Sequence, residues 1–247
     1  MKWLGHALLV AILTILSQIG GLAWLIALAF RRRLLAFMIS YAALWGIAFA
    51  LAPAFGRVAL PCFGDTLRMQ SPIYCLLARN YVSPELEAVA RDAATKVAQE
   101  YPGTVTLALD GGFPFLDGMP LLPHMSHDDG DKLDFAFYYS WDGEYLPGVT
   151  RSPIGYWAFE PDGRSECPPV VLTARWNLPW LQLLFPDYAL NSERTAALAR
   201  ALMADPRIGK VFLEPPLAAR LGITGAKLRF QGCRAARHDD HIHAQLG

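Results

Sequence analysis

Five of the six histidines in this 247-residue chain fall into two short clusters. The first cluster is His124 and His127 in the segment PHMSHDDGDKLDF, and the second is His238, His241 and His243 in RHDDHIHAQLG. Histidine is the commonest metal ligand in proteins and a common proton-transfer group. The clusters therefore predict a metal or catalytic site, and a chance grouping on solvated acidic loops is the alternative.

A carboxylate and a strand-like spacing complete a possible ligand set. Gly130 predicts a turn after His127, and the strand expected next carries Asp134 on its polar face. His241 and His243 are two residues apart on another predicted strand, which places both rings on one face of a sheet. Two or three nitrogens and one oxygen fit Zn²⁺ with one position left for water, and an open position favours hydrolysis. Spacing alone leaves open whether both His241 and His243 bind the metal.

Side-chain periodicity and capping residues predict the elements that hold this site. Ser83 can cap a helix over 84–101, whose first position suits Pro84. Large apolar residues alternate with smaller or polar ones over 132–139, which is typical of a strand. Helices and strands mix without regular βαβ alternation, so we expect an α+β fold with a mostly antiparallel sheet and flanking helices. The other predicted elements are strands over 104–109, 170–176, 210–213 and 241–246, and a helix over 192–204 that Asn191 caps.

The N-terminal region predicts a membrane anchor. Two uncharged runs, 7–30 and 34–55, are each long enough to cross a bilayer, so residues 1–57 are expected to form a two-helix transmembrane hairpin. The triplet Arg31–Arg33 between them favours a cytoplasmic loop, which places residues 58–247 on the extracytoplasmic side. A cleaved signal peptide is the alternative for the first run, but its apolar core is normally only about 7–15 residues long.

The formal net charge of zero describes two unlike regions. The chain has 22 basic and 22 acidic residues, but residues 1–57 hold five of the basic ones and none of the acidic ones. Residues 58–247 therefore carry 17 basic and 22 acidic residues, a net charge of −5. Neither region has the basic surface of a nucleic-acid-binding protein. No repeat or linker divides residues 58–247, which are expected to form one domain with a full core.

The four cysteines all lie after the predicted anchor. An even count in an oxidising compartment predicts two disulfides, and sequence alone leaves the three possible pairings open. A cysteine zinc site is the competing use, but no CxxC spacing occurs. The least entangled pairing is Cys62 with Cys75 and Cys167 with Cys233.

The two histidine motifs together resemble those of the penicillin-insensitive murein endopeptidases. The HxxGxxxD motif begins at His127 and ends at Asp134, and the HxxHxH motif covers residues 238–243. The segment IGKVFLEPP at 208–216 is also similar to the strand that precedes the final histidines in those enzymes. The resemblance covers roughly residues 104–247. The wider group of zinc peptidases includes lysostaphin-type enzymes, D-alanyl-D-alanine peptidases and the hedgehog signalling domain. The resemblance therefore implies a fold like that of the hedgehog domain and the D-alanyl-D-alanine peptidases.

The resemblance implies a role for each of these residues. His127, Asp134 and His243 would be the three zinc ligands. His241 would lie beside the reacting water and act as general base or stabilise the oxyanion. The two remaining histidines, which would line the substrate cleft or contribute to a second metal position, are His124 and His238.

The function that the resemblance implies is hydrolysis of peptide bonds next to D-Ala in peptidoglycan stem peptides. With the predicted anchor, the chain is expected to be a zinc metallopeptidase of the bacterial inner membrane that faces the periplasm. The sequence leaves open whether it is an endopeptidase or a D,D-carboxypeptidase. Two alternatives also stay open: a non-catalytic zinc-binding or cell-wall-binding module on the same fold, and a membrane protein whose histidine clusters are structural.

Overall fold

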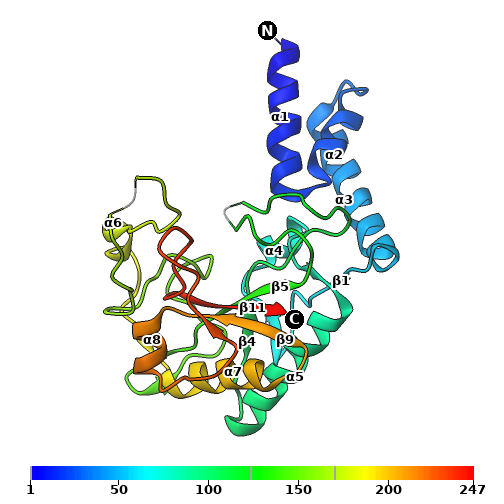
Figure 1. Ribbon diagram of the computed structural model, residues 1–247. Coiled ribbons are helices and arrows are strands. Elements are labelled where there is room, and N and C mark those ends of the chain that lie inside the picture. The colour runs from blue at the N-terminus through cyan, green and yellow to red at the C-terminus, as the bar shows by residue number, and fades with distance from the viewer. Residues whose placement is uncertain (1, 123, 170) are drawn as a thin grey trace.

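The molecule has a helical head and a larger body (Figure 1). The computed structural model describes residues 2–122, 124–169 and 171–247. We call residues 2–57 the head and residues 58–247 the body. The head contains only helices, and the described part of the body combines helices with three β-sheets.

The first apolar run folds back on itself instead of forming one helix. Helix α1 (Lys2–Ser17) ends beside Gln18, whose φ of +57° turns the chain, and α2 (Gly20–Ala27) packs back against α1. Eight residues of helix are only about 12 Å long, so α2 is too short to cross a bilayer core of about 30 Å. The predicted hairpin of two continuous spans, 7–30 and 34–55, is therefore not confirmed.

A pair of glycines explains why the chain can fold back here. A Cβ atom at Gly20 would lie 2.7 Å from the backbone oxygen of Leu13, and one at Gly21 would overlap the hydroxyl of Thr14. Only glycine allows α1 and α2 to approach so closely. The sequence shows this pair as a small interruption in an apolar run, and hydropathy alone does not distinguish a fold-back from a straight span.

The third helix fits the second predicted span. Helix α3 (Arg33–Leu51) continues into the 3₁₀ helix η1 (Ala52–Phe55). Among the described residues, Arg33–Phe55 is the one helix long and apolar enough to cross a membrane. The turn after α1 also contacts the body, because the side-chain oxygen of Gln18 accepts a hydrogen bond of 3.0 Å from the backbone N–H of Phe115.

The body is built on a six-stranded sheet. Its three central strand pairs are antiparallel and the pair at each edge is parallel, so the sheet is mixed. The predicted α+β class is confirmed, whereas a predominance of antiparallel pairing is not. In spatial order the strands are β10 (Leu228–Arg229), β9 (Ile208–Phe212), β11 (His241–Leu246), β5 (Lys132–Ala136), β4 (Thr106–Ala108) and β2 (Leu67–Met69).

Two long helices cover the side of this sheet that lies away from the head (Figure 1). Helices α5 (Pro84–Glu100) and α7 (Ser192–Ala204) pack against each other, and their apolar faces are buried in the main core. The side chains of Ser83 and Asn191 cap them by accepting backbone N–H hydrogen bonds of 3.4 and 3.1 Å. Both helices therefore begin where the capping pattern predicts.

Two of the predicted strands differ in the structure. The strand expected over 132–139 ends at Ala136, and Tyr139 begins a strand of a separate three-stranded sheet. The strand expected over 170–176 is wrong: residues 171–176 form bends whose apolar side chains face outward, and Val170 lies outside the described residues. The remaining elements are β1 (Val58–Ala59), α4 (Pro72–Leu76), β3 (Tyr81–Val82), β6 (Tyr139–Trp141), β7 (Glu144–Tyr145), α6 (Pro179–Gln182), β8 (Ala189–Leu190) and α8 (Pro215–Arg220).

Two disulfides join parts of the body. Cys62 is bonded to Cys75, and Cys167 is bonded to Cys233, so the least entangled pairing is the one present. The second bond joins residues 66 apart and fixes the loop after Cys167 to the segment that leads into β11. Such a bond stabilises a fold mainly by restricting the unfolded chain, and two of them fit an oxidising compartment.

Candidate metal centre

The register between β5 and β11 places Asp134 directly opposite His243. Opposite residues of an antiparallel pair project to the same face, and Nδ1 of His243 lies 2.8 Å from Oδ1 of Asp134. Ile242 points the other way and is fully buried in the core, as the alternation predicts. Strand pairing thus brings together two residues that are 109 positions apart in the chain.

His127 reaches the same carboxylate from the loop before β5. Its Nδ1 lies 2.9 Å from the backbone oxygen of Gly111, and because a carbonyl only accepts, Nδ1 carries the proton. Its Nε2 is therefore free to bind a cation, and it lies 3.3 Å from Oδ1 of Asp134 and 3.2 Å from Nδ1 of His243. Gly130 makes the turn with a φ of +78°, where a larger residue would also meet a neighbouring side chain.

His124 approaches the second oxygen of the carboxylate. Its Nδ1 lies 2.9 Å from Oδ2 of Asp134, without the alignment of a hydrogen bond. His124, His127 and Asp134 each offer a ligand atom within 4.8 Å of the others, so this group could hold a metal ion. The structure thus contains a possible metal site where the first histidine cluster predicts one.

The histidines keep the central carboxylate ionised. Asp134 is fully buried. Burial opposes its ionisation, but the surrounding imidazoles, His127 first among them, hold the pKa of Asp134 well below its usual range. The centre of the cluster is therefore a negative charge that faces several nitrogen ligands, which is the electrostatic requirement of a cation site.

His241 is paired with a carboxylate of its own. Its Nδ1 lies 2.5 Å from Oδ1 of Asp240, and its Nε2 lies 3.7 Å from Oδ2 of Asp134. Burial alone would lower the pKa of His241, but Asp134 and then Asp240 raise it to about 9. The other oxygen of Asp240 accepts a hydrogen bond of 2.5 Å from the backbone N–H of Trp157, so both the carboxylate and the ring are held in place.

The sixth predicted residue, His238, completes the cluster. Its ring centre lies 4.9 Å from that of His241 and 5.6 Å from that of His243. Burial, followed by the charges of these two rings, lowers the pKa of His238 well below its usual range, so it stays neutral. Its Nδ1 is buried without a hydrogen-bond partner. All six predicted site residues line one cavity of about 250 Å³.

A tyrosine and an ion pair belong to the site but were not predicted. The hydroxyl of Tyr156 donates a hydrogen bond of 2.7 Å to Oδ2 of Asp134 and accepts one of 3.1 Å from the backbone N–H of Asp110. Burial and then the charge of Asp134 raise the pKa of Tyr156 well above its usual range, so it stays a donor. Arg79 holds Asp110 with two hydrogen bonds of 2.7 and 2.8 Å. Tyr156 and Arg79 lie in loops without periodicity, so no sequence pattern indicates them.

No family model and no curated protein matches this chain. The resemblance to the murein endopeptidases therefore stays a prediction from two motifs. What the structure adds is independent of it, because the motifs meet around one carboxylate.

Proposed function

We propose that the chain is a membrane-anchored zinc metallopeptidase that hydrolyses peptide bonds next to D-Ala in peptidoglycan, with its body in the periplasm. The observation that carries the proposal is the convergence of His127, Asp134 and His243, with the pair His241–Asp240 beside them. The first three residues offer ligands, and the pair offers a positioned proton carrier. A structural histidine cluster has no need for the second feature.

The separations of the proposed ligand atoms suit zinc. Ligand atoms at about 2.0–2.1 Å from a tetrahedral ion lie about 3.3 Å from each other. The three separations among His127 Nε2, Asp134 Oδ1 and His243 Nδ1 are 2.8, 3.2 and 3.3 Å. The carbonyl of Gly111 fixes the tautomer of His127, as the outer partners of zinc-binding histidines usually do. A set of two imidazole nitrogens and one carboxylate oxygen also matches the borderline character of Zn²⁺.

Each neighbouring residue then has a chemical task. Zinc in this position would polarise the scissile carbonyl and lower the pKa of a water molecule. The positive charge of zinc would oppose the two carboxylates that raise the pKa of His241. The neutral imidazole, oriented by Asp240, would then take the proton of the attacking water and deliver it to the leaving amine. Tyr156 holds Oδ2 of Asp134, so that Oδ1 stays turned toward His127 and His243.

The head and the disulfides support the proposed location. Helix α3 with η1 offers one membrane span. The basic residues Arg31–Arg33 favour placement of the start of this helix on the cytoplasmic side. The body would then begin at Val58 on the opposite side of the membrane. Two disulfides in the body support that side, because the periplasm is oxidising.

A non-catalytic zinc-binding or wall-binding module is the second candidate. It would keep the ligands but would have no need for a buried imidazole held by a carboxylate. The pair His241–Asp240 therefore favours the enzyme.

The test uses the purified full chain, cross-linked muropeptides and a chelator. We expect cleavage products by mass spectrometry that disappear with the chelator and return with zinc. His127→Ala and His243→Ala should each lose bound zinc and reduce cleavage at least about a thousandfold. His6→Ala, which removes the one histidine outside the clusters, is the matched control and should keep both. Stoichiometric zinc without cleavage would favour the binding module, and cleavage by a metal-free variant would contradict the proposal.

A further inference from the structure

The largest exposed apolar stretch of the body lies in residues 171–184. Val171 is fully exposed and Leu183 is 87% exposed, although both are large apolar residues. The one charged residue in this stretch, Arg175, has its side chain buried in an ion pair, so the exposed surface is uncharged. A soluble protein rarely leaves such a surface uncovered. The other large apolar side chains exposed here are Leu172, Trp176, Trp180 and Leu184.

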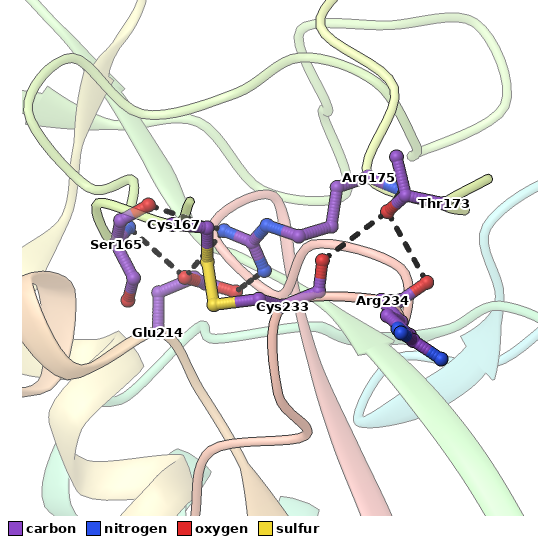
Figure 2. Close-up of a disulfide and its surroundings, with 7 residues drawn as sticks. All are labelled: Ser165, Cys167, Thr173, Arg175, Glu214, Cys233 and Arg234. Atoms are coloured by element: carbon purple, nitrogen blue, oxygen red, sulfur yellow. Dashed lines mark hydrogen bonds and ion pairs between the residues drawn. A yellow bond between two sulfur atoms is a disulfide. The ribbon is translucent and has the colours of Figure 1, made fainter. Parts of the chain in front are cut away.

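The base of this stretch is firmly attached to the body, as Figure 2 shows. The disulfide Cys167–Cys233 lies at its start. Arg175 donates hydrogen bonds of 2.9 and 3.0 Å to the two carboxylate oxygens of Glu214, and Thr173 donates to the backbone oxygen of Cys233 at 3.3 Å. Residues 176–184, which we call the tip, therefore expose apolar side chains on a fixed base.

The tip lies on the side of the body from which the head rises. In Figure 1 the loop that carries α6 extends from the body in the same direction as α1 and α3. Between the loop and the head lies the segment that reaches Gln18 through Phe115, and it exposes Leu116, Leu122 and Met125. Exposed apolar side chains therefore occur both in this segment and in the loop that carries α6.

The lining of the metal cavity includes residues from both of these apolar segments. Met125 and His124 come from the segment beside the head, and Ala174 comes from residues 171–184. Trp176 and Trp180 of the stretch also line a larger cavity of about 980 Å³, whose lining includes Tyr156 of the metal centre. The cavity is thus next to the surface that a bilayer around α3 would face.

We propose that residues 171–184 are a second membrane contact, which lies in the headgroup region of the bilayer that holds α3. Tryptophan and leucine without exposed charge suit this region, and the head of the same chain brings the bilayer to this side of the body. The metal cavity then opens toward the membrane surface, and the peptides it takes are those presented there. This inference rests on the proposed anchoring of the head.

The experiment places an environment-sensitive fluorophore on the tip. All four native cysteines are disulfide-bonded, so the label NBD will attach to a single introduced thiol, at Leu183→Cys, in the full chain. The chain is placed in nanodiscs of phosphatidylcholine and phosphatidylglycerol with and without headgroup-region spin-labelled lipid. Met38→Cys in α3 is the control for insertion, and the exposed Gln99→Cys in α5, on the far side of the sheet, is the control for water exposure.

We expect the spin-labelled lipid to quench the probe at Leu183→Cys severalfold more than the probe at Gln99→Cys. If Met38→Cys is quenched and Leu183→Cys behaves like Gln99→Cys, the second contact is overturned while the anchor stands. If Met38→Cys is not quenched, the anchor fails and the inference fails with it. A blue-shifted but unquenched probe at residue 183 would indicate cover by protein and would also overturn the inference.

A second variant separates docking from folding. Leu184→Glu adds a charge to the tip and should reduce quenching of the probe at Leu183→Cys severalfold. Its zinc content should equal that of the parent, because residue 184 does not line the metal cavity. Unchanged quenching in the charged variant would count against the bilayer as the occupant.

Discussion

The metal cavity has two walls of different construction. One wall is the pair β5 and β11, where register alone sets Asp134 opposite His243. The other wall, around Ala174 and Ala236, has no strand and is held by the disulfide Cys167–Cys233 and the pair Arg175–Glu214. The strand wall carries Asp134, His241 and His243, which His127 joins from the loop before β5, and the loop wall carries cross-links. Substitutions in the first should therefore change metal binding and cleavage, and substitutions in the second should change stability.

The largest effect that sharpens this comparison is expected at His241 on the strand wall. His241→Gln keeps a polar side chain of similar size but removes the group that would carry the proton. We expect cleavage of muropeptides to fall by about 10²–10⁴-fold while bound zinc stays stoichiometric. Elemental analysis and product quantification check both halves. Loss of zinc would show instead that His241 is a ligand, and unchanged cleavage would show that it has no role in proton transfer.

On the loop wall, the largest effect should follow from breaking the buried ion pair. Arg175→Met leaves the carboxylate of Glu214 buried and unpaired, which should lower the free energy of unfolding by about 3–5 kcal/mol. Urea denaturation of the full chain in detergent measures it. Arg91→Met is the matched control, because Arg91 forms an exposed ion pair within α5 that should contribute less than about 1 kcal/mol. Equal losses in the two variants would contradict the contrast between the walls.

A smaller effect is expected at Tyr156, a loop residue whose hydroxyl contacts Asp134 of the strand wall. Tyr156→Phe removes the hydrogen bond to Oδ2 of Asp134 and leaves the ring in place. Removal of an outer partner of a metal ligand typically weakens metal binding about 10–100-fold. Competition with a zinc-binding dye measures the affinity. Since Tyr156 would position a ligand without binding zinc itself, stoichiometric loading at high zinc should persist, and an unchanged affinity would refute the role.

The smallest effect is a change in how stability depends on pH. Burial raises the pKa of Glu214, but hydrogen bonds from Arg175 and Ser165 outweigh it and leave the pKa below its usual value. A glutamate in the unfolded chain has a pKa of about 4.3. The stability that Glu214 contributes is therefore present above about pH 4.3 and is lost as pH falls through the lower pKa of the folded state.

Denaturation at a series of acidic pH values measures this loss. Glu214→Gln should be less stable at neutral pH and should lose less further stability as the pH falls. Glu144→Gln, at an exposed position of β7, is the matched substitution and should follow the parent curve. A steeper acid dependence in Glu214→Gln would contradict the prediction.

The same contrast explains what could be predicted from the sequence. The HxH spacing placed His241 and His243 on one face of β11, and the glycine turn placed His127 near Asp134, because strand and turn rules act over a few residues. Tyr156 could not be found in this way. Its place at the site depends on tertiary packing of a loop without periodicity.

One wrong prediction and one that is not confirmed have physical causes that local rules do not include. Apolar alternation over 170–176 is typical of a strand, but in the described part of this segment the apolar side chains face outward and no partner strand is present. In the head, hydropathy identified an apolar run but could not show that Gly20 and Gly21 let it fold back. Both features depend on what surrounds a segment, which composition does not specify.

The junction between head and body has a consequence for the range over which the protein could act. Helix η1 ends at Phe55, and β1 begins at Val58, so only Gly56 and Arg57 lie between them. Arg57 is itself buried and forms an ion pair with Asp117. These two residues are too short a linker for the body to move far from the end of α3. With α3 in a bilayer, the cavity would keep a constant height above the membrane, and the proposed peptidoglycan substrate would be cleaved only within about one body length of the bilayer.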